Sequence, residues 1–570
     1  MIFYFFGFVL LSAAIFVINK NYRTRKKQQL IGYLKNSWGK SQSVTHYNFD
    51  LIDRYFLNQI GSAAAAGCFQ LISDKLAEDL YLDSVFKAID RTTSKIGQQY
   101  LYFKIRAVDK KLGNLMKFDS LVTEFQTDEA LRIKCQLSLH KLSKLGSYYF
   151  EDLIYGETTE KPKNFSLIYL LSILSICSLI AAFIYPQVLL LFFVVFALNT
   201  LLHYWNKKNL SLHLSSLVEY SNVYSTATTL HSQPLLCGFC EDPTFFLELK
   251  ALNKKMRFIN LISNVEDDPT SIIFLVSELF KIAFNLEVIV FYSLIGDVKA
   301  KKEALGKLFA FIGQIDSAIS VASYRASAPH FCKPNFLSPK HLKVKDLIHP
   351  LIESCTPNSL TLDKQSLLLT GSNMSGKTTF IRSIAINLLL GQTIYTCLAS
   401  EFNAPFSRIF SSINIADNLL NNTSYYLEEV ITLKDFIDES IDTEPALFIL
   451  DELFKGTNTL ERIANGKAVL SSLNQNDHLV LVSTHDVELC DLLYPSFNLY
   501  HFSESIIDSE LVFDHKIKEG RLRTSNAIRL LEANGYPKSI ISDAYSTYDA
   551  LKVKHMSVVG LTVSVENQPD

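Results

Sequence analysis

The chain has 570 residues, a formal charge of −2 at pH 7 and 48% hydrophobic residues. At roughly 100–200 residues per domain, this length predicts about three to four folding units. High apolar content with low net charge excludes wholesale disorder. The balance of 55 basic and 57 acidic residues excludes a globally basic nucleic-acid binder, although a local basic surface stays possible. The nine scattered cysteines do not resemble the pattern of a short secreted domain, so we expect reduced thiols in a cytosolic compartment.

The N-terminus predicts a membrane anchor. Residues 1–19 carry no charged side chain, and a basic cluster follows directly, formed by Lys20, Arg23, Arg25, Lys26 and Lys27. A cleavable signal peptide would carry its positive charge ahead of the apolar run. We therefore predict an uncleaved transmembrane anchor at 1–19 with the N-terminus outside, followed by a basic juxtamembrane linker at 20–44 that faces anionic lipid. Because the apolar run is short for a span, the alternative is a buried N-terminal helix.

A second apolar run predicts a transmembrane hairpin over 164–206. No charged side chain occurs there, and Pro186 divides it into 165–185 and 188–205. The first half would be about 31 Å long as a helix, which matches the hydrocarbon thickness of a bilayer. Lysines flank the run on both sides: Lys161, Lys163, Lys207 and Lys208. Both ends should therefore lie in the cytoplasm, which predicts a multi-pass membrane protein with three transmembrane helices in total. The apolar stretch 272–295 contains charged residues, so we expect a core helix there.

The remaining chain predicts a helical region and an α/β domain. Residues 45–163 and 207–335 have apolar residues at helical spacing. Over 336–550, short β-rich runs alternate with helical stretches, a pattern typical of a parallel sheet flanked by helices, and 551–570 form a tail. The predicted buried strands are 366–370, 446–450 and 479–483.

The most specific motif is a glycine-rich loop that follows the apolar run 367–369 and precedes a predicted helix at 379–390. The loop reads Gly371, Ser372, Asn373, Met374, Ser375, Gly376, Lys377 and Thr378, with Thr379 after it, and fits G-x-x-x-x-G-K-[ST]. Glycines let backbone N–H groups converge on phosphates, and the helix N-terminus adds positive potential. Lys377 can reach the β- and γ-phosphates, and the Thr378 hydroxyl can bind Mg²⁺. We therefore expect ATP and Mg²⁺ as cofactors; the alternative is a chance loop.

Polar residues follow two other predicted strands. Asp451 and Glu452 come directly after the strand at 446–450, and His485 follows the strand at 479–483. A carboxylate at the end of a buried strand is costly without a metal or hydrogen bonds, so Asp451 fits as a Mg²⁺ holder and Glu452 as the group that polarises water. His485 could sense the γ-phosphate. The alternatives are an acid that caps the next helix and a structural histidine.

These residues together resemble a known family. The loop 370–379 is similar to the T-G-P-N-M-x-G-K-[ST]-T loop of the MutS family of mismatch-repair ATPases. Further segments resemble its D-E-x-x-x-G-T-[SN]-T box (451–459), its S-T-F-x-x-E signature (423–428) and its T-H switch (484–485). The likeness covers 340–545, and it is weaker at 89–97, which resembles the D-x-T-x-T-x-x-G start of the family's helical core, and at 323–334, which resembles the end of its lever.

The resemblance implies an ABC-type P-loop ATPase domain that dimerises, with Ser424 and Glu428 of one chain completing the partner's nucleotide site. It implies a core-like region at 45–163, a lever-like region at 207–335, and DNA binding. The family's mismatch-reading domain has no counterpart, because 1–45 are an anchor and a linker. The missing L-S-G-G-Q motif argues against an ordinary transporter ATPase.

The combined hypothesis is a membrane-anchored, DNA-binding ATPase of the mismatch-repair type, working as a homodimer that hydrolyses ATP at a composite interface. The alternative is a membrane-bound ATPase switch that acts on protein partners without binding DNA. A transporter would need more polar groups than the hairpin offers. Cys237 and Cys240 have only His231 as a nearby third ligand, so no structural zinc is expected.

Overall fold

The structure is a computed structural model that describes 2–41, 47–61, 67–156, 165–240, 242–263, 272–372, 374–413, 425–442, 444–507, 510–522 and 527–558. Within these ranges, some side chains are not described, including those of 2–16 and 206–218. The chain forms two compact units. The first comprises Met1–Ile72, Asp83–Pro329 and Gln392–Tyr395, and the second comprises Ser73–Leu82, His330–Gly391 and Thr396–Asp570. The predicted domain boundaries stay predictions.

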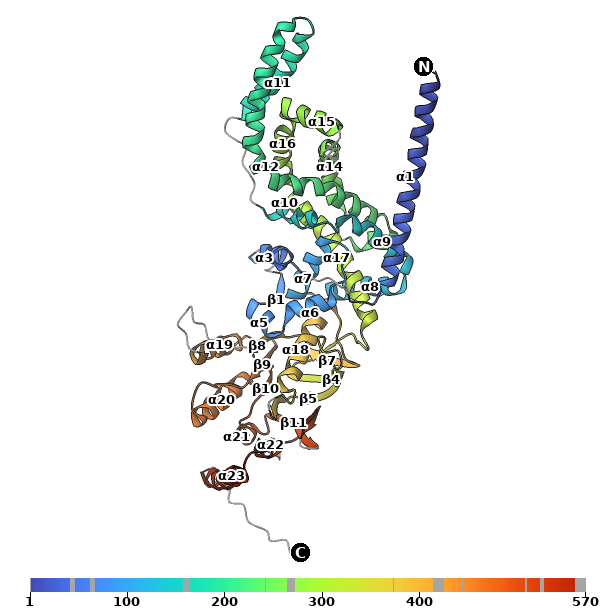
Figure 1. Cartoon of the computed structure of the whole chain (residues 1–570). Coiled ribbons are helices and arrows are strands. Elements are labelled where there is room, and N and C mark those ends of the chain that lie inside the picture. Colours follow the sequence, from blue (N-terminus) through green and yellow to red (C-terminus); the bar gives the residue numbers. More distant parts are fainter. Residues whose placement is uncertain are drawn as a thin grey trace. The chain divides into compact units, whose positions relative to one another are not determined.

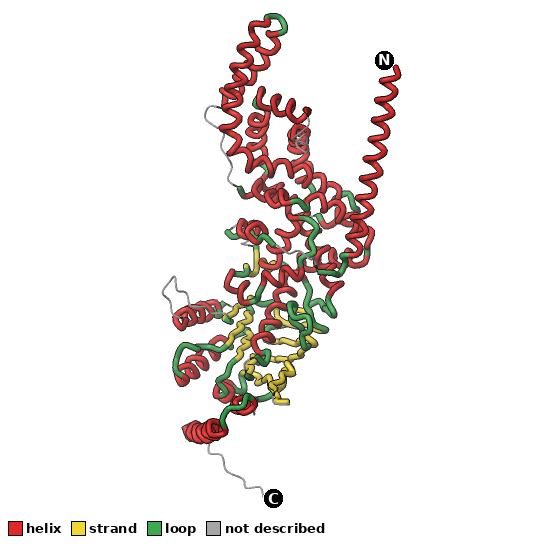
Figure 2. Tube along the Cα trace, viewed as in Figure 1, coloured by secondary structure: helices red, strands yellow, loops and turns green. Residues whose placement is uncertain are grey.

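The first unit is almost entirely helical, as the red tube in Figure 2 shows. Its α-helices are α1 (Ile2–Asn36), α2 (Phe49–Ile52), α3 (Arg54–Gln59), α6 (Leu82–Ile89), α7 (Lys95–Arg106), α8 (Leu112–Thr127), α9 (Glu129–Leu139), α10 (Asp152–Tyr155), α11 (Phe165–Ala182), α12 (Leu189–His231), α13 (Pro234–Phe239), α14 (Thr244–Ser263), α15 (Ile272–Ala283), α16 (Leu286–Ala300) and α17 (Lys302–Ser327). Strands β1 (Cys68–Leu71) and β2 (Ala107–Asp109) form a small antiparallel pair.

The segment 89–97 owes its residue pattern to a buried hydrogen-bond network at the start of α7. Asp90 accepts hydrogen bonds from the Thr92 backbone N–H and hydroxyl. Asp316 of α17 accepts from the Ser94 backbone N–H at 2.7 Å, so its carboxylate lies at the N-terminus of α7, where a negative charge is favourable. A Cβ on Gly97 would overlap the Asp316 carboxylate. The glycine is therefore required by the close packing of α7 on α17.

Among the residues that the structure describes, three helices are long and apolar enough to cross a membrane: Phe165–Ala182, Pro186–Trp205 and Lys302–Ser327. The first two coincide with the predicted hairpin and are 22% and 17% buried within the structure. The third, α17, is 78% buried and packs against α7 and α8, so its apolar composition reflects a core position. The predicted anchor at 1–19 lies in α1, but most of its side chains fall outside the described residues.

The single helix expected over 272–295 is wrong. Two helices, α15 and α16, occupy this stretch and are separated at Phe284 and Asn285. Asn285 adopts a left-handed backbone conformation (φ 48°), which ends the α15 helix. Asparagine tolerates this conformation better than most residues, because its short polar side chain can make local hydrogen bonds.

The second unit contains a six-stranded mixed sheet in the order β12-β11-β6-β10-β9-β8. Its strands are β6 (Ser366–Thr370), β8 (Arg408–Ser412), β9 (Ala446–Asp451), β10 (Leu479–Ser483), β11 (Phe497–Ile507) and β12 (Glu510–Glu519). All neighbours pair in parallel except β11 with β12. The three predicted buried strands are thus confirmed as the adjacent strands β6, β10 and β9. Each of them is an apolar run because helices cover both faces of a parallel sheet.

Helices and a second sheet surround these strands in the second unit (Figure 1). The four-stranded sheet has the order β3-β7-β4-β5. Its strands are β3 (Asn335–Leu337), β4 (His341–Leu347), β5 (Asn358–Asp363) and β7 (Glu401–Pro405). The helices are α5 (Asp74–Asp79), α18 (Lys377–Ile394), α19 (Tyr425–Glu439), α20 (Thr459–Leu473), α21 (Glu488–Leu493), α22 (Ala527–Ala533) and α23 (Lys538–Val558). The carboxyl ends of β6, β9 and β10 meet at one edge of the six-stranded sheet.

Candidate functional site

The glycine-rich loop connects β6 to α18 and wraps around the amine of Lys377. This lysine is 4% exposed, and its Nζ donates to the backbone oxygens of Gly371 (2.8 Å) and Ser372 (2.9 Å). Burial lowers the pKa of the amine, while the carboxylates of Glu452 and Asp451 oppose that shift. The loop thus holds a positive charge at the N-terminus of an 18-residue helix. Both features attract an anion.

Two glycines of the loop lie in backbone conformations that other residues rarely adopt. Gly371 has a φ of 149° and Gly376 a φ of 110°. A Cβ on Gly371 would also lie 2.8 Å from the Phe502 backbone oxygen of β11. Positive φ and close approach are both available to glycine at little cost, so the motif glycines are explained by the shape of the loop.

Asp451 ends β9 beside the first turn of α18. The Thr378 hydroxyl donates to Asp451 Oδ2 at 2.9 Å, and the Ser483 hydroxyl at the end of β10 donates to Asp451 Oδ1. Asp451 and Ser483 are register partners of the parallel pair β9–β10, so the sheet itself brings them together. The result is a cluster of hydroxyl and carboxylate oxygens next to the loop.

The structure brings Glu452 and His485 together at the carboxyl edge of the sheet. Glu452 Oε1 lies 2.9 Å from His485 Nε2, and its Oε2 lies 2.9 Å from Lys455 Nζ. The hydrogen bond from His485, aided by Lys455, lowers the pKa of Glu452 to about 2 although partial burial opposes the shift. The backbone of Glu452 has a φ of 55°, and its N–H donates to the Ser483 oxygen at 2.9 Å. An ionised carboxylate is therefore held at the carboxyl edge of the sheet.

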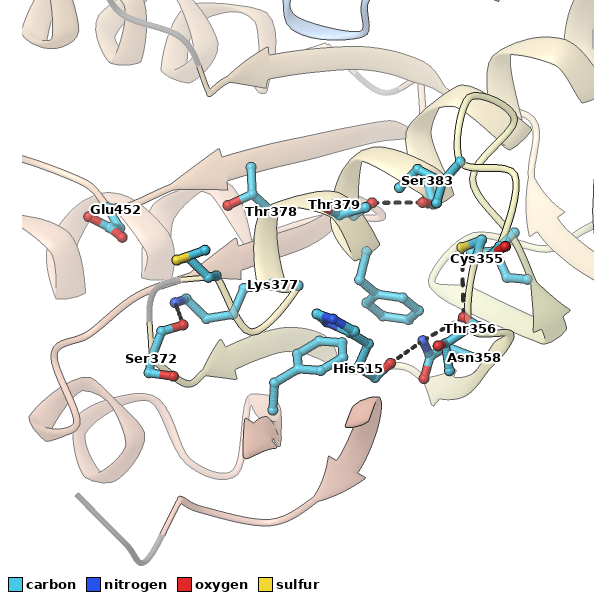
Figure 3. Close-up of a pocket in the computed structure, with 17 residues that line it drawn as sticks. Cys355, Thr356, Asn358, Ser372, Lys377, Thr378, Thr379, Ser383, Glu452 and His515 are labelled. Carbon is cyan, nitrogen blue, oxygen red and sulfur yellow. Dashed lines mark hydrogen bonds between the residues drawn. The ribbon is translucent and has the colours of Figure 1, made fainter. Parts of the chain in front are cut away.

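A cavity of about 360 Å³ opens beside the loop (Figure 3). At one end it is lined by Ser372, Lys377, Thr378, Thr379 and Glu452. The rest of the lining is more apolar and comes from the loop, α18 and further segments of the same unit: Leu347, Ile352, Ser354, Cys355, Thr356, Asn358, Met374, Gly376, Phe380, Ser383, Phe502 and His515. A ligand with an anionic group at one end and a flat, weakly polar group at the other matches this division.

The far wall of the cavity is held by hydrogen bonds between segments distant in the sequence. The Asn358 amide donates to the His515 backbone oxygen at 2.9 Å, and Asn358 Oδ1 accepts from the Ile517 N–H at 2.9 Å. His515 Nδ1 lies 3.1 Å from the Ser375 backbone oxygen. Strand β12 is thereby tied to β5 and to the loop. His515 was not predicted as a site residue, because a lone histidine in a strand carries no sequence signal.

Comparison with known proteins places this arrangement in a family. Residues 367–552 match the family model described as MutS domain V. The chain is 31% identical over 303 residues to proteins named "DNA mismatch repair protein MutS" from Staphylococcus aureus strains JH9, Newman and N315. The part of the chain that carries the site therefore belongs to the MutS family.

The MutS likeness covers part of each protein. The matched region is 50% of this chain and 34% of each curated relative, so the chain aligns with about a third of the length of those relatives. The family model begins inside β6, immediately before the glycine-rich loop, and extends through α22 into α23. It therefore includes the loop, the Asp451–Glu452 pair and His485.

Most of the residues predicted from the MutS-like motifs lie around one cavity or beside it. Met374 is 83% exposed and points out of the loop, whereas Ser375 is buried and donates to the Ser372 oxygen at 2.8 Å. Asn373 and Ser424 lie outside the described residues, so their predicted roles stay predictions. The same holds for the predicted role of Glu428, which concerns a partner chain.

The two neighbouring glutamates at the start of α19 have different surroundings. Glu428 is half-buried and lies 4.0 Å from Lys75 of α5, whose amine also donates to Thr432 at 2.6 Å. Glu429 is 1% exposed, and its Oε1 accepts the Phe454 backbone N–H at 2.6 Å. Its Oε2 has no hydrogen-bond partner among the described residues, and burial raises its pKa.

Glu429 is a residue that the sequence analysis missed. It links α19 to the segment after β9 that carries Glu452. Tyr426 strengthens this link, because a Cβ on Gly456 in that segment would lie only 2.9 Å from the Tyr426 Cβ. A signal was available: in S-T-F-x-x-E the acid follows the serine by five positions, and counting from Ser424 gives Glu429.

The cysteine pair shows no closed metal site. Cys237 Sγ lies 3.8 Å from His231 Nε2, and both Cys237 and Cys240 are free. Among the described residues, no group of three or more His, Cys, Asp and Glu side chains could hold a metal ion.

Proposed function

We propose that this chain is a membrane-anchored ATPase that binds ATP in the cavity beside the loop 371–378 and hydrolyses it to ADP and phosphate. The observation that carries the proposal is the juxtaposition of the Lys377 cradle with the Asp451–Glu452 pair at one edge of the sheet. MutS-family membership supports a mismatch-repair-type ATPase. The apolar part of the cavity near Ile352 and Phe380 suits a nucleotide base.

Each residue of the site has its own role in the binding or hydrolysis of ATP. Lys377 and the N-terminus of α18 bind and orient the phosphates, because both present positive potential to them. Glu452, held ionised by His485 and Lys455, orients and polarises the attacking water. His485 lies close enough to Glu452 to respond when a γ-phosphate arrives or leaves.

The oxygen cluster fits a magnesium ion. Thr378 supplies a hydroxyl and Asp451 a carboxylate, which are hard oxygen ligands of the type that Mg²⁺ prefers, and Mg²⁺ keeps several waters when few protein ligands are offered. When bound there, the ion would neutralise charge on the β- and γ-phosphates.

The packing of α11 against α12 supports a membrane location for this hairpin. Its outward side chains are large and apolar; Leu170, Ile180 and Leu201 are each at least 60% exposed. Its buried side chains include the polar residues Ser175 and Asn199, and the Asn199 amide donates to the Ser175 hydroxyl at 3.1 Å. A hairpin in water would show the opposite distribution, whereas lipid-embedded helices pack through small and polar residues. We propose that 164–206 spans the membrane, with the second unit in the cytoplasm and the N-terminus outside.

We further propose that the protein works as a homodimer in which Ser424 and Glu428 complete the partner's nucleotide site, and that it binds DNA. Both proposals are supported by family membership. The alternative, a switch that acts on protein partners without DNA, is favoured by the membrane hairpin inside the helical region, because that hairpin would limit access to chromosomal DNA.

One set of measurements tests these proposals. Full-length protein in detergent should hydrolyse ATP, and Lys377→Ala should abolish the activity, since the cradle loses its charge. Adding duplex DNA at two salt concentrations distinguishes a DNA-binding ATPase from a switch that acts on protein partners. If the protein contacts DNA phosphates, DNA should bind or stimulate the ATPase rate, and this effect should weaken steeply as salt rises. An unchanged ATPase rate in Lys377→Ala would refute the assigned nucleotide site. Equal ATPase rates with and without duplex DNA, together with no DNA retained at low salt, would favour the switch that acts on protein partners.

A further inference from the structure

The turn between α15 and α16 is attached to the hairpin by buried hydrogen bonds. The Asn199 amide of α12 donates to the Ala283 oxygen at 2.8 Å, and the Ser172 hydroxyl of α11 donates to the Phe284 oxygen at 3.0 Å. The Asn285 amide donates in return to Asn199 Oδ1 at 2.7 Å. The last carbonyls of a helix have no partner within the helix, so side chains of the hairpin satisfy the end of α15.

This attachment lies within the apolar part of the hairpin. Along α12, Asn199 is about 20 Å from Pro186 at the hairpin tip and about 9 Å from Trp205, at 1.5 Å per residue. Exposed apolar side chains continue past Asn199 toward the soluble region, and Leu201, Tyr204 and Trp205 are 69%, 62% and 77% exposed. If the exposed apolar band marks the lipid, the α15–α16 turn lies inside it.

The described surface of α15 also suits contact with lipid. Leu279 and Phe280 are 47% and 57% exposed, although α15 runs beside the hairpin in Figure 1 and contacts α12. Lys281 is 2% exposed and forms an ion pair with Glu278 at 2.7 Å, so the two charges compensate each other. Ionisable groups at membrane depth are tolerated when they face the bundle and are paired.

Helix α16 carries Glu287 two positions after Asn285, and its next charged residue is Asp297. Asp297 pairs with Lys255 of α14 at 2.6 Å, and both side chains are more than a third exposed. Asp297 lies about 18 Å from Asn285 along the helix. The next charged residue on α12, Lys207, lies about 12 Å beyond Asn199. Apart from Glu287, the charged residues of α16 and α12 beyond the turn begin about 18 Å and 12 Å away from it.

We infer that α15 and the start of α16 form a re-entrant helical hairpin inserted in the lipid, with Leu279 and Phe280 facing acyl chains. The inference rests on the proposed membrane location of the α11–α12 hairpin. A break between helices is costly in hydrocarbon unless its backbone groups are satisfied by protein, and Asn199 and Ser172 provide those hydrogen bonds. Because α16 leads into α17, this segment also connects the membrane part of the chain to the second unit.

Tryptophan reporters and brominated lipids test the inference in the full-length protein. Trp38 and Trp205 are first replaced by phenylalanine, and the protein is reconstituted in phosphatidylcholine vesicles with or without bromine on the acyl chains. Phe280→Trp and Leu279→Trp report on α15, and Phe183→Trp, at an 88% exposed position, reports on the hairpin tip. Leu247→Trp is the aqueous control, because it occupies a 74% exposed position on α14.

We expect brominated acyl chains to quench Phe280→Trp and Leu279→Trp at least twofold, as they quench Phe183→Trp, and to leave Leu247→Trp unchanged. Two independent reporters on α15 guard against a local disturbance by either one. Quenching of Phe183→Trp without quenching of either α15 reporter would overturn the re-entrant segment and leave the membrane hairpin intact. Absence of quenching at Phe183→Trp would instead refute the membrane proposal itself.

Discussion

Replacing Glu429 tests whether α19 positions the proposed catalytic carboxylate. The Glu429 side chain is 1% exposed, and its carboxylate accepts the N–H of Phe454, two residues after Glu452. Both Glu452 and Phe454 have positive φ values, 55° and 58°, in the tight segment after β9. Such conformations persist only where the surroundings hold them in place. Glu429→Ala removes the side chain that holds this segment.

The expected magnitude follows from the lost hydrogen bond. Leaving a buried backbone N–H without an acceptor costs about 1–3 kcal/mol, which corresponds to a factor of about 5–150. A displacement of a catalytic group by about 1 Å can by itself cost about 100-fold in rate. We therefore expect Glu429→Ala to lower kcat about 10- to 100-fold, with KM for ATP within about twofold, because the Lys377 cradle is untouched.

The assay is steady-state ATP hydrolysis by the purified full-length protein, with thermal unfolding measured in parallel. Glu429→Gln should retain kcat within about threefold, since its amide oxygen can still accept the Phe454 N–H and burial already raises the pKa of the native carboxyl. Glu439→Gln is the matched control on the same helix, because Glu439 pairs with Arg408 at the other end of α19. Wild-type kcat in Glu429→Ala would refute the reasoning, and so would an equal loss in Glu429→Gln and Glu429→Ala.

Three further predictions concern other residues. Glu452→Gln should lower kcat at least about 100-fold while ATP still binds, and a wild-type rate in this variant would contradict the catalytic assignment. Because the pKa of Glu452 is about 2, any loss of wild-type ATPase rate on acidification above pH 4 must come from the protonation of another group. Burial, with nearby Arg382, lowers the pKa of His349 from 6.5 to about 4, so the unfolded chain gains a proton first as the pH falls. In urea unfolding, the free energy of unfolding of the wild type should fall by up to about 3 kcal/mol between pH 6.5 and pH 4, and the decrease should be smaller in His349→Asn. An equal pH dependence in both proteins would refute this assignment. Gly97→Ala should lower the melting temperature of the helical unit by several degrees, since the new Cβ would meet the Asp316 carboxylate, and an unchanged value would mean that α7 can shift freely.

The sequence alone determined the features that depend on residues close together in the chain. The loop 371–378 and the strands β6, β9 and β10 were predicted correctly, because a glycine-rich turn and a run of buried apolar residues are local patterns. The hairpin helices were predicted from the same kind of signal. Asp451 and Glu452 could be placed near the loop because parallel strands end at the same edge of a sheet.

Only the tertiary structure decided what lies beside these elements. The role of Glu429 depends on its contact with Phe454, 25 residues away, and the contact of His515 with the Ser375 oxygen of the loop depends on strand β12. The break between α15 and α16 was missed because its apolar residues continue on both sides; hydrogen bonds from Asn199 and Ser172 satisfy the free carbonyls at that point. Such contacts join residues that are distant in the chain, so no local pattern encodes them.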